Sequence, residues 1–419
     1  VVVRRLRLVN DVRAAIHTAY LDNREYAPIA QVNLVTGSLL EAMERIGGRA
    51  FTSSEHFGVP FDIGCAWLHA ADRNPFYPEA QAAGWTLEYH DMALDHLYFG
   101  KRKAEPSEID GMNRADAALT AALEVYSGGE DRLSAIINKG HGMRAVATYA
   151  GPMDFGQDLD EISIADFNRA ADLNPNYFTM EGYGALVARW GADVPVELST
   201  PVTTIRWDGL LVEAETPRGT VRGKRIIITV STGVLAFGNI EFEPELPPAY
   251  TQSFFDLPMG MLTKIPLEIS GTRLGLKPFE DFLIEQPARH DLYFLCFPFD
   301  LDSMVGFVGG DFAWEMSVAG EAAARDFAID RLAGIFGSDV RKQVGRSMMT
   351  NWGAEPTVRG AYAAARPGKA GARDVLAAPV DERVFFAGEA LGGPLIQTCA
   401  GARLAGESVV QAIARLRRD

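Results

Sequence analysis

An acidic residue and a glycine pair near the start of the chain have the chemistry to hold a dinucleotide. Glu41 ends a strand-like run that begins at Ser38, and Gly47, Gly48 and Arg49 follow a few residues later. A carboxylate at the end of a strand can accept both hydroxyls of a ribose, and paired glycines let the backbone approach a pyrophosphate closely. Arg49 adds a fork of charged hydrogen-bond donors. The same pattern also fits an ordinary loop, so this segment alone does not identify a cofactor.

Two later segments carry further candidate residues. Residues 61–69 read Phe-Asp-Ile-Gly-Cys-Ala-Trp-Leu-His, and residues 385–390 read Phe-Phe-Ala-Gly-Glu-Ala and lead through Thr398 into a final helix. Together with the acid at position 41, and in this order, they resemble the flavin-dependent amine oxidase family, which includes monoamine and polyamine oxidases. The resemblance extends from Leu39 nearly to the C-terminus, and further segments match the family in order at 182–187, 201–205, 230–235 and 257–264.

The resemblance implies an α/β fold in which a Rossmann-like domain binds FAD. Glu41 would contact the adenosine ribose, Val202 would pair its backbone with adenine, and the Thr398 backbone, at a helix N-terminus, would face the flavin O2 edge. Ala361 stands where monoamine oxidases carry the cysteine that bonds the flavin, so we expect FAD to be bound non-covalently. The implied cofactor contacts are Glu41, Gly48, Arg49, Gly64, Trp67, Val202, Gly388, Glu389 and Thr398.

Four residues are implied on the substrate side of the flavin. Lys264 matches the family lysine that holds a water against flavin N5, where burial would lower the pKa of its ammonium group. Trp352 and Tyr362 match aromatic positions beside the amine, although a Trp and a Tyr also commonly pack in a core. His69 matches a histidine at the substrate entrance of polyamine oxidases, and its alternative is a structural histidine. Because Leu395 replaces the second aromatic residue of the family's cage, we expect a one-sided wall.

The N-terminal segment departs from the family's pattern. Family members begin with a strand and a Gly-x-Gly-x-x-Gly turn about 25 to 30 residues before the ribose acid. The first glycine of this chain is Gly37. Either residues 1–36 are a misread, for instance a locally shifted reading frame, or the chain has lost a central part of its FAD site. The intact motifs elsewhere favour the first interpretation, and the second would leave a flavin-free protein with the same fold and an interaction role.

The implied reaction transfers a hydride from the carbon beside an amine nitrogen to flavin N5, and dioxygen then reoxidises the flavin with release of hydrogen peroxide. We expect a primary or secondary amine or a polyamine, because no arginine stands at an identifiable carboxylate-clamp position. The formal net charge of −15 fits cationic ligands and disfavours nucleic acid. An amino-acid oxidase or a desaturase of the same superfamily is the alternative, and a homodimer is compatible with the sequence.

The chain is long enough to need more than one domain to position these residues. With 419 residues, 47% of them hydrophobic and 23% charged, we expect a globular two-domain enzyme. Residues 1–70, 195–240 and 375–419 are predicted to form a discontinuous FAD-binding domain. Residues 71–194 and 241–374 are predicted to form an inserted α+β substrate-binding domain, with the active site at the junction.

Cysteine usage and hydropathy favour a reducing, cytoplasmic location. Cys65, Cys296 and Cys399 are far apart and form no CxxC pair, which predicts neither a disulfide framework nor a zinc site. No segment approaches the roughly 20 consecutive apolar residues that span a bilayer. The opening residues 1–8 lack the apolar stretch and cleavage site of a signal peptide.

Hydrophobic periodicity predicts the elements that carry the motifs. Apolar spacing of three and four in 105–145 and 320–345 predicts amphipathic helices that cover a substrate region. Two β-rich runs within 203–229, joined by a turn at 215–219, predict a hairpin or small meander beside the main sheet. Strands are expected at 38–41, 202–205, 210–214, 225–230 and 383–387.

Overall fold

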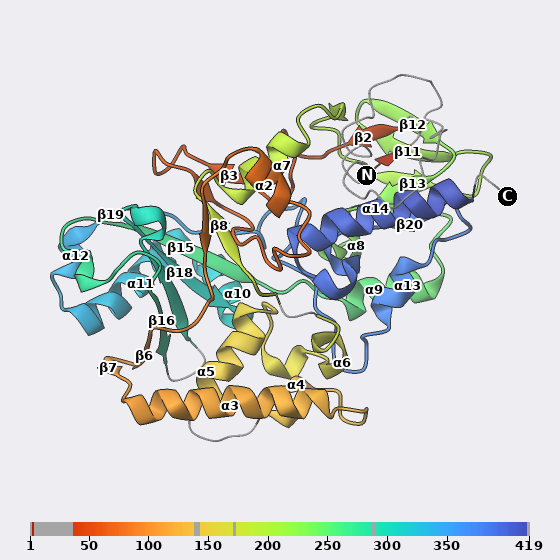
Figure 1. Cartoon of the computed structure of the whole chain (residues 1–419). Helices are drawn as coiled ribbons and strands as arrows, with labels where there is room; N and C mark the ends of the chain where they lie inside the picture. Colours follow the sequence, from red (N-terminus) through yellow and green to blue (C-terminus); the bar gives the residue numbers. More distant parts are fainter. Residues whose placement is uncertain (1, 4–36, 138–142, 171–172, 287–289, 417–419) are drawn as a thin grey trace.

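The computed structural model describes residues 2–3, 37–137, 143–170, 173–286 and 290–416, and these form an α/β fold. A five-stranded and a four-stranded sheet lie on one side of the molecule in Figure 1, and a seven-stranded sheet lies on the other. The segment in which the family carries its glycine turn, residues 4–36, lies outside the described residues. No helix among the described residues is long and apolar enough to cross a membrane.

The five-stranded sheet carries the motifs at the two ends of the chain. Its order is β20 (Val384–Phe386), β13 (Ile226–Ile228), β1 (Val2–Val3), β2 (Ser38–Leu40) and β9 (Val196–Glu197). The β13–β20 and β2–β9 pairs are parallel, whereas β1 runs antiparallel to both of its neighbours. The strands predicted at 38–41, 225–230 and 383–387 are confirmed with slightly shorter bounds. Glu41 therefore follows the end of β2, and Gly388 follows the end of β20.

The four-stranded sheet contains the predicted meander. Its order is β12 (Gly219–Gly223), β11 (Val212–Thr216), β10 (Thr204–Arg206) and β14 (Glu241–Glu243). Antiparallel pairing joins β10 to β11 and β11 to β12, which confirms the meander, although β10 and β11 begin two residues later than predicted. Ile205, Val212, Ile226 and Phe386 share one buried core, so the meander packs against the five-stranded sheet. Strand β14 lies just beyond the predicted domain boundary at residue 240. The domain boundaries stay a prediction.

The seven-stranded sheet forms a second core. Its order is β19 (Val344–Ser347), β15 (Leu262–Ile269), β18 (Ser303–Gly309), β17 (Leu292–Cys296), β16 (Asp281–Glu285), β6 (His96–Phe99) and β7 (Arg102–Lys103). Most of β15 is buried, as expected for a strand covered on both faces. Helices α10 (Gly310–Ala319) and α11 (Glu321–Phe336) pack on this sheet, and α12 (Val340–Gln343) follows.

A long helix covers the lower edge of the molecule in Figure 1. It is α3 (Pro106–Glu124), which begins with proline at its first position and a reciprocal capping box between Glu105 and Glu108. The helix ends well before residue 145, because Gly128 and Gly129 have φ values of 116° and 108° that a helix cannot contain. The rest of the predicted 105–145 region holds α4 (Leu133–Ile136) and the start of α5 (Met143–Thr148).

Two short strand pairs connect the larger layers. They are β3 (Thr52–Ser53) with β4 (Phe61–Asp62), and β5 (Leu87–Tyr89) with β8 (Tyr177–Thr179). The buried carboxylate of Asp62 accepts the backbone N–H groups of Tyr183 at 2.9 Å and Gly184 at 3.0 Å, at the first turn of a helix. This capping contact fixes residues 61–65 against that helix. The remaining helices are α2 (Tyr77–Ala82), α6 (Ile164–Phe167), α7 (Tyr183–Trp190), α8 (Thr232–Ala236), α9 (Pro248–Asp256), α13 (Ala372–Ala377) and α14 (Cys399–Arg415).

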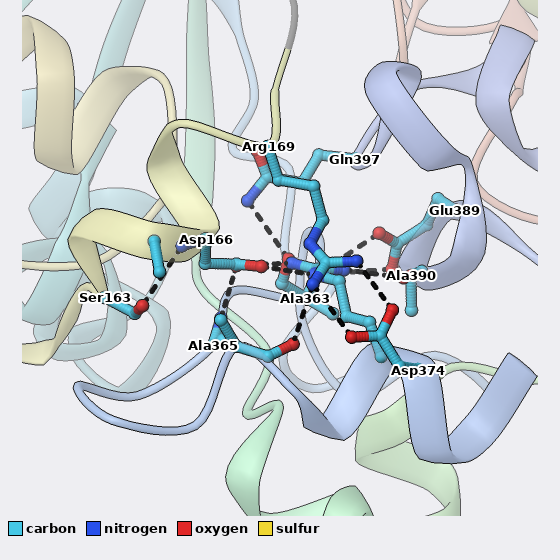
Figure 2. Close-up of polar contacts among 12 residues, drawn as sticks. Ser163, Asp166, Arg169, Ala363, Ala365, Asp374, Glu389, Ala390 and Gln397 are labelled. Atoms are coloured by element: carbon cyan, nitrogen blue, oxygen red, sulfur yellow. Dashed lines mark hydrogen bonds and ion pairs between the residues drawn. The ribbon is translucent and has the colours of Figure 1, made fainter. Parts of the chain in front are cut away.

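A buried ion pair joins α6 to α13 beside the C-terminal motif. Arg373 donates from Nε and Nη2 to the two carboxylate oxygens of Asp166 at 2.6 and 2.7 Å, and both side chains are almost fully buried. Arg373 also donates to the carbonyls of Ala363 and Ala390, and Asp166 accepts the N–H of Ala365. Figure 2 shows Asp166 facing the backbone around Ala363 and Ala365, with Glu389 and Ala390 on the other side. One ion pair thus holds two separate segments of chain together.

Replacing Arg373 with methionine is expected to destabilise the fold strongly. The change leaves the Asp166 carboxylate buried without its partner, which costs about 3–5 kcal/mol of unfolding free energy. Urea unfolding followed by far-ultraviolet circular dichroism measures the loss. Arg169→Met is the matched control, because Arg169 makes a similar two-point contact with Asp374 at a more exposed place and should contribute less than about 1 kcal/mol. Equal losses in the two variants would contradict this prediction.

Candidate active site

A large cavity lies where the sheets meet. Its volume is about 1910 Å³, which exceeds the roughly 300–1,000 Å³ of most small-molecule sites and leaves room for a large cofactor together with a substrate. Every candidate residue expected from the sequence lines this cavity, although the motifs that contain them are spread over most of the chain. The residues are Glu41, Gly48, Arg49, Gly64, Trp67, His69, Val202, Lys264, Trp352, Tyr362, Gly388, Glu389 and Thr398.

The expected dinucleotide end of the cavity is formed by the loop after β2. The Glu41 carboxylate accepts the N–H of Met43 at 2.9 Å, which holds it at the end of the strand. Gly48 has a φ of 56°, and a Cβ atom placed there would meet no heavy atom within 4 Å. Gly388, after β20, has a φ of 127°. Both glycines therefore present backbone at the cavity in conformations that side chains disfavour, and in front of Gly48 the space is open.

Arg49 and Glu389 connect the N-terminal and C-terminal motifs. Arg49 Nη1 donates to Glu389 Oε1 at 3.0 Å and to the carbonyl of Ala361 at 2.5 Å. The carboxylate of Glu389 also accepts the N–H of Ala363, at 3.2 and 3.3 Å from its two oxygens. These bonds satisfy a buried carboxylate and place Ala361, which has no reactive group, on the cavity wall.

Thr398 caps the N-terminus of α14 at the cavity. Its Oγ1 accepts the N–H of Gly401 at 2.9 Å and donates to the carbonyl of Leu395 at 2.8 Å. The positive end of a 17-residue helix therefore points at the cavity wall, which favours negative charge nearby. Leu395 does not stand on that wall, because it packs against Ala70 and Ala400. The expectation that Leu395 takes the second position of an aromatic cage is therefore wrong for this fold.

Lys264 is buried on β15 with its ammonium group at the cavity. Its Nζ donates to the backbone carbonyls of Asp62 at 2.7 Å and Gly64 at 2.6 Å. Burial lowers the pKa of Lys264 to about 8, and the nearby Asp62 carboxylate opposes this shift. The group is consequently close to equal populations of its charged and neutral forms at mildly alkaline pH. A Cβ atom on Gly64 would lie 1.6 Å from the carbonyl oxygen of Arg49, so the backbone under Lys264 requires glycine.

Trp352 and Tyr362 stand on the cavity wall with their polar atoms bonded to backbone. Trp352 Nε1 donates to the carbonyl of Ile63 at 3.2 Å, and the Tyr362 hydroxyl donates to the carbonyl of Met153 at 2.8 Å. Burial raises the pKa of Tyr362 well above its usual range. Both rings therefore offer apolar faces rather than titrating groups, which suits packing against a flat or aliphatic ligand.

Trp67 and His69 form a stacked pair on the same wall. Their ring centroids are 6.1 Å apart with an interplanar angle of 11°. His69 Nδ1 lies 2.7 Å from Asn176 Oδ1, and Asn176 donates its own N–H to Asn174, so the Nδ1 of His69 carries the proton in this contact. Burial lowers the pKa of His69 to about 4. The imidazole is therefore neutral at physiological pH and keeps Nε2 as an acceptor.

Four carboxylates that line the cavity were not expected from the sequence, namely Asp91, Asp116, Glu124 and Asp154. Asp154 follows the π-helical segment Tyr149–Met153, and Asp116 lies on the face of α3 that lines the cavity. Asp154 lines the cavity, and protein atoms surround its carboxylate on the other sides. This burial, together with the negative charge of Asp116, raises the pKa of Asp154 to about 7. The alternation of acidic and apolar residues in 109–124 is the sequence pattern from which a cavity position for Asp116 could have been predicted. Asp154 carries no comparable signal, because only the tertiary fold brings it beside Tyr362.

The two helical regions expected to cover the substrate behave differently. Residues of α3 line the cavity, namely Ile109, Met112, Asn113, Asp116, Thr120, Leu123 and Glu124. Helix α11, in contrast, contributes no lining residue, because its buried residues Ala324, Ala328 and Leu332 pack into the core of the seven-stranded sheet. The expectation that 320–345 covers the substrate region is therefore wrong.

Comparisons with known proteins identify the family of the chain. A family model described as flavin containing amine oxidoreductase matches residues 35–135 and 147–414. The chain is 26% identical over 425 residues to probable polyamine oxidase 4 of Arabidopsis thaliana, a match that covers 89% of this chain and 81% of that protein. It is also 22% identical to lysine-specific histone demethylase 2 of Homo sapiens, of which it spans about half, with 88% of this chain and 49% of that protein covered.

A solved structure of putrescine oxidase bound to putrescine has a similar fold. Its TM-score is 0.75, and the match covers 91% of this chain and 94% of that chain at 16% sequence identity. At that identity the likeness shows a shared fold and nothing finer. It confirms the predicted fold class, in which α/β elements assemble as in the flavin-binding amine oxidases.

Lys264 is expected to react with acylating reagents at lower pH than ordinary lysines do. Only the neutral amine reacts, and a pKa of about 8 makes that form abundant from mildly alkaline pH upward. Brief labelling of the native chain with acetic anhydride across a pH series, read out by peptide mass spectrometry, gives the rate at each lysine. The exposed Lys103 is the internal reference. A rate at Lys264 that rises in parallel with the rate at Lys103, without an inflection near pH 8, would show that the ammonium is not destabilised.

Proposed function

Because the chain belongs to the flavin-containing amine oxidoreductases, we propose that it is an FAD-dependent oxidase of primary or secondary amines, with a polyamine as the best-fitting substrate. The observation that carries this proposal is the position of Lys264. Its Nζ is held by two backbone carbonyls in the same cavity as Trp352, Tyr362 and the Arg49–Glu389 pair. A buried ammonium group with a pKa of about 8, beside apolar rings, suits a site in which a proton is transferred next to a redox cofactor.

The residues present fit a bound flavin dinucleotide. Open space in front of Gly48 and the positive end of α14 suit a pyrophosphate and an electron-rich ring edge, and Glu41 suits a ribose. Ala361 offers no nucleophile, which supports non-covalent binding. The flavin would accept a hydride from the carbon beside the amine nitrogen and pass electrons to dioxygen. We place it between the proposed FAD-binding and substrate-binding domains, where the cavity lies.

The side chains around the cavity would bind, orient and move protons. Lys264 would hold a water molecule against the flavin and exchange a proton with it, since its pKa of about 8 allows both states. Tyr362 and Trp352 would form the wall that orients the apolar arm of the amine. His69, neutral through its low pKa of about 4, would accept a hydrogen bond from an ammonium or amine N–H at Nε2.

Charge in the cavity supports a substrate with more than one amine. Among the described residues that line it, Arg49 and Lys264 are the cationic side chains, and both are already bonded to Glu389 or to carbonyls. The carboxylates of Asp116 and Asp154 line the same cavity, and the charge of Asp116 helps to raise the pKa of Asp154. A second ammonium on the substrate would relieve their repulsion, whereas the carboxylate of an amino acid would meet negative charge. The homodimer and the cytoplasmic location stay predictions.

Purified chain that is incubated with excess FAD and then separated from unbound FAD by gel filtration is expected to keep oxidised-flavin absorption near roughly 370 and 450 nm. The bands should bleach when an amine is added under anaerobic conditions. Acid precipitation should release the flavin into the supernatant, since no covalent bond is expected. Glu41→Gln should weaken FAD binding about tenfold, because one charge-assisted hydrogen bond to the ribose is lost. A chain that takes up no flavin would contradict the oxidase proposal and favour a flavin-free protein with this fold.

Asp154→Asn is expected to lower kcat/KM for a diamine about tenfold while changing kcat/KM for a monoamine little. The carboxylate is neutral below its pKa of about 7 and charged above it, so discrimination in favour of the diamine should rise as pH increases through 7. Steady-state kinetics with both substrates across pH 6–9 measure the effect. Asp110→Asn, which removes an exposed carboxylate of α3 outside the cavity, is the matched control. If both variants change the diamine and the monoamine equally, Asp154 does not bind the second amine.

A further inference from the structure

We propose that two buried residues outside the cavity, His90 and Asp281, position the stacked pair of rings on its wall and set the tautomers that this wall presents. Neither residue is among the described residues that line the cavity. Their side chains are only 4% and 1% exposed, and His90 Nε2 lies 2.9 Å from Asp281 Oδ2. The reaction proposed above gives this buried pair no role.

The side chain of His90 holds Trp67, the first ring of the stacked pair. The indole Nε1 of Trp67 donates to His90 Nδ1 at 3.4 Å. Because an indole N–H can only donate, His90 Nδ1 is an acceptor in this contact and carries no proton. The imidazole then has its proton on Nε2, which lies against the Asp281 carboxylate. Asp281 thus selects the form of His90 that can accept the Trp67 N–H.

The backbone of His90 supports the second ring of the pair, which is His69. The His90 N–H donates to the carbonyl of Asn176 at 3.0 Å. The side chain of Asn176 places Oδ1 at 2.7 Å from His69 Nδ1, while its Nδ2 donates to Asn174 at 2.9 Å. Asn176 therefore presents an acceptor to His69, whose proton is on Nδ1. The stacking of His69 on Trp67 closes a circuit that passes twice through His90.

The Asp281 end of the circuit is fixed by backbone bonds at the start of β16. The N–H of Asp281 donates to Asp95 Oδ2 at 2.8 Å, and the N–H of Asp95 donates to the carbonyl of Asp281 at 3.1 Å. Phe178 packs on both Trp67 and His90, with ring centroids 4.7 and 5.4 Å away. A change at Asp281 can therefore reach the cavity wall through one continuous set of contacts.

The consequence for the reaction rests on the proposed function, in which His69 Nε2 accepts a hydrogen bond from the amine. A proton on Nδ1 leaves the lone pair of Nε2 for that bond, whereas the opposite tautomer would present a second donor to the amine N–H. Loss of the circuit should therefore weaken amine binding more than it slows the chemical step. His90 and Asp281 are then positioning residues that determine substrate affinity without touching the substrate.

Nuclear magnetic resonance of the whole flavin-free chain, with isotope-labelled histidine and tryptophan at neutral pH, tests the circuit without any amine. We expect opposite tautomers in the two histidines, with the proton of His69 on Nδ1 and that of His90 on Nε2. His69→Gln and His90→Gln assign the two sets of signals. The indole N–H of Trp67, assigned with Trp67→Phe, should exchange slowly with water because it is bonded to a buried acceptor.

Substitutions at Asp281 separate hydrogen bonding from packing. Asp281→Asn keeps an oxygen that accepts the His90 Nε2–H, so the tautomers and the slow exchange should stay as in the native chain. Asp281→Leu removes that acceptor, so His90 should lose its preference for the Nε2–H form and the Trp67 indole N–H should exchange about tenfold faster. His90→Phe keeps a ring without an acceptor and should speed the exchange equally.

The matched control is a second histidine and acid pair on the same sheet. His96 on β6 lies with Nε2 at 3.9 Å from Glu280, and it is separate from the circuit. His96→Phe should leave the tautomers of His69 and His90 and the exchange of the Trp67 indole unchanged. The proposal is overturned if His69 and His90 share one tautomer, if His90→Phe leaves the indole exchange unchanged, or if Asp281→Asn and Asp281→Leu behave alike.

Steady-state kinetics of the FAD-loaded chain test the consequence for the substrate. Asp281→Leu should raise KM for an amine about tenfold and change kcat less than about threefold, and Asp281→Asn should restore the native KM. A fall in kcat with an unchanged KM would show that the circuit does not position His69 for binding. A native chain that takes up no flavin would contradict the proposed function alone, since the resonance experiments decide the circuit without it.

Discussion

The geometry of the cavity depends on one buried charge pair. Arg373 and Asp166 are both removed from water, and they bond one another and backbone groups of segments 363–365 and 389–391. A buried charge without a partner costs several kcal/mol, so these segments cannot move apart without that loss. The segment at 363 follows Tyr362, and the one at 389 carries the partner of Arg49. The ion pair therefore fixes the relative positions of the aromatic wall and the C-terminal cofactor motif.

Hydrogen bonds to the backbone satisfy the donors of the two cationic side chains found among the described residues that line the cavity. Lys264 bonds two carbonyls, and Arg49 bonds a carbonyl as well as Glu389. The charge of Asp116 acts together with burial to raise the pKa of Asp154 to about 7. The carboxylates that line the cavity have the same sign as the net charge of the whole chain, and negative charge favours cationic ligands.

The sequence was most informative where a residue's role depends on its immediate neighbours. Thr398 caps a helix, and Glu41 ends a strand, because both features are set within a few residues. The glycine pair Gly128 and Gly129 predicts that α3 ends before residue 130, whereas the apolar spacing alone predicts helix as far as residue 145. The place of Asp154 and the burial of Leu395 depend on segments that meet only in the folded chain. The local sequence pattern carries no information about contacts between segments that are distant in the sequence, so these features could not be predicted.

The cavity face of α3 contributes a continuous set of side chains to one wall of the cavity. Asn113, Asp116 and Thr120 are spaced by three and four residues, so they lie along one side of a single helix, while the cofactor motifs come from other parts of the chain. This part of the cavity wall is therefore encoded in one short continuous stretch of the gene. A combinatorial library confined to these three codons would vary one wall of the cavity without changing the residues proposed to contact FAD, which makes this helix a practical starting point for directed evolution of the proposed activity.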